Sequence, residues 1–183
     1  AAQLFQLLSS PAVAPAEAIA LAHAAASAAI VAGGWADTRV AEHAAGLRAA
    51  LPDATCFCAG GTLVPDAAER AAGLEDFTEY RGGPAPTSPA PTRAERLADA
   101  LGRDTVRVEC TSTTITEQAA NVAGELEPGT DTLLVVASAY QRAGMRLALS
   151  ASAPTARVVC VDSANGSDAA SDTAWFSSQG RAL

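Results

Sequence analysis

Five short apolar runs recur along the chain, and glycine, proline or polar residues bound each of them. Such runs are typical of strands that are buried on both faces of a parallel sheet. Between the runs, apolar residues recur at helical spacing and predict helices. The sequence predicts strands at 28–32, 54–59, 105–110, 132–137 and 156–161, and helices at 4–8, 15–26, 37–51, 66–73, 92–101, 114–126 and 141–149.

Strands and helices alternate, an order that favours a parallel sheet with right-handed crossovers and helices on both faces. We predict the α/β class: a three-layer Rossmann-like domain with a mostly parallel five-stranded sheet whose first strand lies in the middle. A length of 183 residues fits one domain with a full core and is too short for two. We expect an N-terminal helical segment at 1–27, the core at 28–162 and an irregular C-terminal tail at 163–183. The Pro- and Gly-rich segment 82–91 crosses the mouth of the predicted sheet, as a binding loop or lid or as a simple connection.

Composition narrows the classes of partner. A net charge of −8 argues against nucleic acid and against an anionic membrane surface, because both need clustered cations. All 12 cationic side chains are arginine, which excludes a lysine Schiff base, a lysine general base and the usual phosphate-binding P-loop. No apolar run approaches the roughly 20 residues that span a bilayer. We expect a cytoplasmic protein; a removed targeting segment and the oligomeric state stay open.

The cysteines and histidines do not form a metal-binding pattern. A metal site would need paired Cys-x-x-Cys motifs or a histidine near a cysteine. His23 and His43 both fall in Ala-rich predicted helices. We therefore predict no metal, and interpret the cysteines as small apolar core residues of a reduced cytosolic protein. All of them fall in or at the end of predicted strands: Cys56, Cys58, Cys110 and Cys160.

The residues that follow the predicted strands form the candidate site. In a sheet of this kind, ligands bind where the carboxyl ends of the strands meet the N-termini of the next helices. Glycines after the first two strands let a ligand approach the backbone closely, and hydroxyl groups follow the third and fourth. The predicted small-molecule-binding residues are Gly33, Gly34, Gly60, Gly61, Arg93, Ser112, Thr113, Gln118, Ser138, Gln141 and Arg142.

A purely structural interpretation of part of this set stays open, because three residue pairs have the spacing of a capping box. Capping alone would explain them without a ligand. Arg142 is harder to explain in this way, since a cation at a helix N-terminus opposes the macrodipole. Its position predicts an anionic ligand or a carboxylate partner such as Glu117. The three pairs are Thr92 with Glu95, Thr114 with Glu117, and Ser138 with Gln141.

Several familiar chemistries are missing from the sequence. No G-x-G-x-x-G follows the first strand and no acidic residue ends the second, which counts against ordinary NAD binding and an ordinary methyltransferase. No G-x-S-x-G elbow occurs, and histidines placed in helices argue against a Ser-His-Asp triad. A carboxylate pair is one catalytic option, because Glu95 and Glu117 both begin helices on the same rim and can serve as acid and base.

Five short motifs, in order, carry a family resemblance: Ile30-Val31-Ala32-Gly33-Gly34, Cys58-Ala59-Gly60-Gly61, Arg93-Ala94-Glu95, Ser112-Thr113 with Glu117, and Gln141-Arg142. No single motif is specific, but their order and spacing over residues 29–161 together resemble the bacterial YdcF/SanA/ElyC-like proteins. The chain departs from that family at Gln118, where an Asn is often found, and at Thr114, which replaces another common Asn. The longer C-terminal region of some YdcF-like proteins is missing or reduced to the tail after Asp162.

The resemblance implies a Rossmann-like domain with an acidic and arginine-containing pocket at the strand ends. It points to the soluble YdcF-like branch, which is associated with S-adenosylmethionine binding, rather than the membrane-anchored SanA and ElyC branches linked to the cell envelope. The leading hypothesis is a soluble protein that binds a nucleotide-type small molecule, with S-adenosylmethionine as the first candidate. The alternatives are an enzyme of a specialised biosynthetic pathway that uses Glu95 or Glu117 in the same pocket, and a protein-interaction module whose partner surface is segment 82–91.

Overall fold

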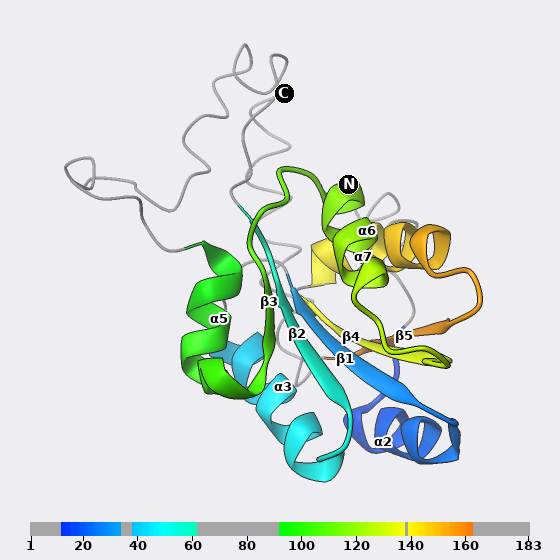
Figure 1. Ribbon diagram of the computed structural model, residues 1–183. Helices are drawn as coiled ribbons and strands as arrows, with labels where there is room; N and C mark the ends of the chain where they lie inside the picture. The colour runs from blue at the N-terminus through cyan, green and yellow to red at the C-terminus, as the bar shows by residue number, and fades with distance from the viewer. Residues whose placement is uncertain (1–11, 34–37, 62–91, 138, 163–183) are drawn as a thin grey trace, which may run out of the picture.

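The computed structural model describes residues 12–33, 38–61, 92–137 and 139–162, and Figure 1 shows how their elements are arranged. In chain order the elements are α2 (Pro15–Ala24), β1 (Ala28–Gly33), α3 (Thr38–Ala50), β2 (Thr55–Ala59), α5 (Arg93–Leu101), the 3-10 turn η2 (Arg103–Thr105), β3 (Arg107–Glu109), α6 (Ile115–Gly124), β4 (Thr132–Val136), α7 (Ala139–Ser152) and β5 (Arg157–Val161).

The five strands form one parallel sheet in the order β3-β2-β1-β4-β5. The predicted fold class and the central position of the first strand are therefore confirmed. The register aligns Ala32 of β1 with Cys58 of β2 on one side and with Val136 of β4 on the other, and Val136 in turn with Val161 of β5. The carboxyl ends of the strands thus meet along one edge of the sheet.

Helices cover both faces of the sheet, which gives the three predicted layers (Figure 1). Ile30 and Leu134 face the core beneath α2, α3 and α5, whereas Val31 and Val135 face the core beneath α6 and α7. Both central strands are buried over nearly their whole length. Strands buried on both faces need apolar residues at every position, which is why they read as continuous apolar runs.

Two of the predicted elements whose bounds differ from the structure do so for clear local reasons. The predicted strand 105–110 is shortened to β3, because the residues before it form η2, in which the Thr105 amide donates to the Gly102 carbonyl. The helix predicted at 141–149 begins at Ala139 and continues to Ser152, where Pro154 prevents a further turn. The predicted helices 4–8 and 66–73, the segment 82–91 and the tail 163–183 lie outside the described residues.

The N-terminal part that the structure describes packs against the edge of the sheet. Val13 pairs with Val161 in a parallel bridge, its amide donates to the Cys160 carbonyl, and its carbonyl accepts from the Asp162 amide. α2 then packs into the core through Ala18 and Ala22. Within the described ranges, no helix has the length and apolar character needed to cross a membrane.

Candidate functional site

The carboxyl-end edge of the sheet contains the point where the strand order reverses, between β1 and β4. In open α/β sheets, ligands bind in the crevice outside this point. Gly33 ends β1, Ala137 follows β4 and Asp162 follows β5. Because the preceding residues are in register, these three residues come next to one another in a row across three strands.

Gln118 brings an unpaired hydrogen-bond donor to this row. It lies in the first helical turns of α6 and is only 5% exposed. A Cβ atom on Gly33 would lie 3.2 Å from Gln118 Nε2 and 3.0 Å from Met145 Cε, so the amide packs against the end of β1. Nε2 is enclosed and has no hydrogen-bond partner. Since buried polar groups are nearly always paired in folded proteins, this unpaired donor calls for an explanation.

Arg142 occupies the corresponding position of the neighbouring helix, because it is the fourth residue of α7 just as Gln118 is the fourth of α6. It is 9% exposed, its NH1 lies 3.1 Å from Asp162 Oδ1, and its Nε is enclosed without a partner. Arg142, a cation at a helix N-terminus, therefore does have the carboxylate partner that its position predicts. That carboxylate is Asp162, at the end of β5, and not Glu117.

Glu109 organises the turn before α6, a role that the sequence analysis missed. At the end of β3 and 4% exposed, it accepts hydrogen bonds from the amide and hydroxyl of Thr111 (both 3.1 Å), from the amide and hydroxyl of Ser112 (2.9 and 2.7 Å) and from Asn121 Nδ2 (2.9 Å). Burial raises the pKa of Glu109, but these hydrogen bonds outweigh it and hold the pKa below its usual value. The sequence feature that could have revealed this role was a charged residue within a predicted buried strand.

This network changes the role that Ser112 can play. Its hydroxyl proton is directed at Glu109, and the residue is 4% exposed. Gly61 packs against it so closely that a Cβ on Gly61 would lie 1.9 Å from the Ser112 carbonyl oxygen. Gly60 is held by two backbone hydrogen bonds. Its amide donates to the Glu109 carbonyl, and its carbonyl accepts from the Ala94 amide. These residues join the ends of β2 and β3, and their contact with a ligand stays a prediction.

The two candidate catalytic carboxylates both bind the backbone at helix N-termini. Glu95 Oε2 accepts from the amide and hydroxyl of Thr92, at 2.7 and 2.9 Å, and completes a capping box. Glu117 Oε2 accepts from the amide and hydroxyl of Thr113, both at 2.8 Å, one residue earlier than a capping box predicts. The backbone hydrogen bonds lower the pKa of both carboxyl groups, with the hydroxyl bonds next in effect. Both carboxylates are therefore ionised near neutral pH.

The remaining predicted site residues are placed only in part. Gln141 is buried in the first turn of α7, and Arg93 begins α5. Gly34, Ser138 and the side chain of Arg93 lie outside the described residues. In the part of the chain that the structure describes, no three His, Cys, Asp or Glu side chains gather where they could hold a metal ion, and the four cysteines are free thiols.

No family model, curated protein or solved structure matches this chain. The resemblance to the YdcF/SanA/ElyC-like proteins therefore stays a prediction.

Proposed function

We propose that this chain is a soluble, YdcF-like protein that binds a nucleotide-type small molecule at the carboxyl-end edge of its sheet, with S-adenosylmethionine as the first candidate. The observation that carries the proposal is the enclosed, unpaired Nε2 of Gln118 beside Gly33 at the point where the strand order reverses. An unpaired buried donor destabilises a fold by about 1–3 kcal/mol, and a ligand acceptor at this position would remove that penalty.

The spacing of the two donors suits an elongated ligand. Gln118 lies against the end of β1, and Arg142 contacts Asp162 at the end of β5, two strands away. Neighbouring strands lie about 4.8 Å apart, so the row from Gly33 to Asp162 spans about 10 Å. A nucleoside that carries an amino-acid or phosphate group has ribose hydroxyls in its middle and an anionic group at one end. The hydroxyl oxygens would accept from Gln118, and the anionic group would accept from the unpaired Nε of Arg142, whose NH1 stays with Asp162.

Binding requires a small rearrangement, because both unpaired nitrogens are enclosed. Met145 is the side chain best suited to provide it. Its Cε packs at Gly33 beside the Gln118 amide, and the unbranched thioether turns between rotamers at low energetic cost. We therefore expect the ligand to displace Met145 Cε from the end of β1 as it reaches Gln118.

A catalytic role for Glu95 and Glu117 has less support. A general acid at neutral pH needs a raised pKa, whereas hydrogen bonds lower the pKa of both groups. As bases they are weak, because each already accepts two hydrogen bonds on the same oxygen. The protein-interaction alternative rests on segment 82–91, which lies outside the described residues. We therefore favour binding over both alternatives.

The test is a thermal-shift and calorimetry panel of S-adenosylmethionine, S-adenosylhomocysteine, nucleotides and sugar phosphates. A ligand at 100 times its dissociation constant adds about 2.7 kcal/mol of stability, which the panel detects. Gln118→Met should lose the effect, whereas Thr116→Val, an exposed change on the same helix, should keep it. If Gln118→Met keeps full affinity, the ligand binds elsewhere; if nothing in the panel binds, the proposed ligand class is wrong.

A further inference from the structure

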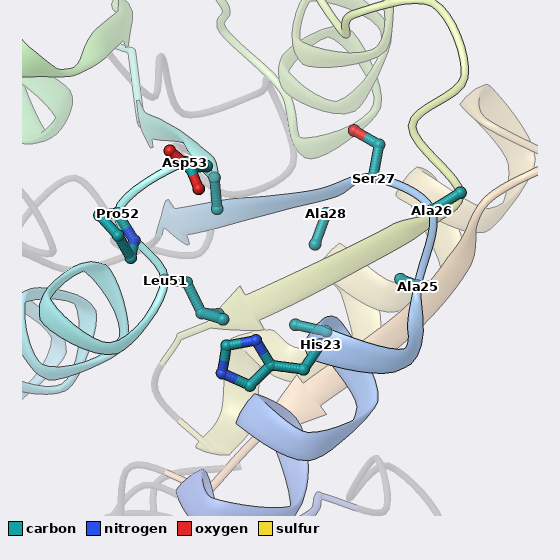
Figure 2. A pocket seen from close by; sticks show the side chains of 10 residues that line it. His23, Ala25, Ala26, Ser27, Ala28, Leu51, Pro52 and Asp53 are labelled. Carbon is teal, nitrogen blue, oxygen red and sulfur yellow. The ribbon is translucent and has the colours of Figure 1, made fainter.

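A pocket of about 280 Å³ lies at the opposite edge of the sheet, where β1 and β2 begin. Two short connections line it: residues 25–27 between α2 and β1, and residues 51–54 between α3 and β2. Ala22 and His23 at the end of α2 and Ala28 at the start of β1 complete the lining. Figure 2 shows the imidazole of His23 reaching from the end of α2 toward Leu51, with Asp53 in the neighbouring connection. Five of the ten lining residues are alanines, which leave the space open.

The electrostatic surroundings of this pocket are negative. α2 ends at Ala24 and α3 ends at Ala50, so the C-termini of two helices meet there, and each carries the negative end of a helix dipole. Asp53 adds an exposed carboxylate. Asp131 adds a second at the same edge, where its Oδ2 accepts from the Ala26 amide at 3.0 Å. That backbone hydrogen bond lowers the pKa of Asp131, so it is ionised.

No arginine lines the pocket, although Arg107 and Arg157 begin strands at the same edge of the sheet. The chain has no lysine. Arg48 lies in the last turn of α3, but its guanidinium points elsewhere: NH1 donates to the Leu101 carbonyl at 2.6 Å and NH2 to the Thr105 hydroxyl at 2.7 Å. His23 is the one titratable base among the lining residues.

We propose that this pocket binds a small organic cation, such as a protonated amine, between the ends of α2 and α3. The ammonium group lies near Asp53 and the terminal carbonyls, and its hydrocarbon part packs on Leu51 and the alanines. The volume is just below the 300–1,000 Å³ that is usual for drug-sized ligands, so the ligand is small. This site is separate from the one at the carboxyl-end edge, and neither proposal depends on the other.

The two histidines make the test direct, because each gives its own imidazole NMR signals. At fixed pH and ionic strength, the intact chain is titrated with 1,4-diaminobutane and, separately, with the neutral 1,4-butanediol. We expect the diamine to shift the His23 signals saturably and to leave those of His43, on the middle of α3, unchanged. The diol should produce no saturable shift.

Two variants identify the charge that holds the cation. Asp53→Asn should weaken diamine binding about two- to fivefold, the usual effect of one exposed ion pair. Glu42→Gln, which removes an exposed carboxylate from α3, should leave binding unchanged. The proposal is overturned if the diamine produces no saturable shift, if the diol binds equally well, or if Glu42→Gln matches the effect of Asp53→Asn.

Discussion

Replacing Gln118 by Met removes an unpaired amide nitrogen from the interior while keeping an unbranched side chain of similar length. Loss of one buried, unpaired polar group returns about 1–3 kcal/mol, and the imperfect fit of the new side chain offsets part of it. We expect a net stabilisation of the ligand-free protein by about 1 kcal/mol. For a chain of this size that raises the melting temperature by about 2–4 °C.

Urea unfolding and thermal melts of the ligand-free protein measure the change. The matched control is Asn121→Leu on the same helix, because Asn121 Nδ2 does have a partner, Glu109 Oε1 at 2.9 Å. That variant should be destabilised by about 1 kcal/mol. If Gln118→Met is destabilised as much as Asn121→Leu, the Gln118 amide is paired within the protein, and the reasoning from an unpaired donor is refuted.

Four further predictions follow from the same edge of the sheet. Glu109→Gln should lower the free energy of unfolding in urea by about 2–3 kcal/mol, because charge-assisted hydrogen bonds are lost and the new amide donor faces other donors. An unchanged urea midpoint of unfolding would contradict this. Because the pKa of Glu109 is lowered in the folded protein, its contribution to stability is complete above the unfolded pKa of about 4.3 and is lost as pH falls through the lower folded value. The stability of the wild-type protein should therefore fall more steeply on acidification than that of Glu109→Gln. Gly61→Ala should destabilise the fold strongly, because its Cβ would lie 1.9 Å from the Ser112 carbonyl oxygen. The control Gly46→Ala has nothing within 4 Å of its Cβ and should stabilise α3 by about 1 kcal/mol. Equal melting temperatures of the two variants would refute the contact. Arg142→Met should abolish ligand-induced stabilisation, while Arg157→Met at the other end of β5 should not; calorimetry that gives equal affinities would remove Arg142 from the site.

The fold could be predicted because its determinants are local in the sequence. The strands at 28–32 and 132–137 are apolar at nearly every position, and only a strand covered on both faces needs that pattern. The capping box of Thr92 and Glu95 was predictable for the same reason, since its partners lie three residues apart. Helix ends were less predictable: α7 begins two residues before its expected start.

The chemistry of the site depends on contacts between distant segments, which spacing cannot reveal. Arg142 pairs with Asp162 twenty residues later, through the end of β5. Glu109 takes a hydrogen bond from Asn121, across the turn into α6. The sequence predicted that Gln118 lies near the carboxyl ends of the strands, but only the structure shows that its Nε2 is enclosed beside Gly33 and unpaired.

The most direct test of ligand binding at the carboxyl-end edge is native mass spectrometry of the wild-type protein and Gln118→Met, each incubated with the same panel of nucleotide-type molecules. We predict a one-to-one complex of the wild-type protein with a panel member, S-adenosylmethionine first, and no such complex of Gln118→Met. Equal complexes of both proteins, or none with the wild-type protein, would contradict the proposed site.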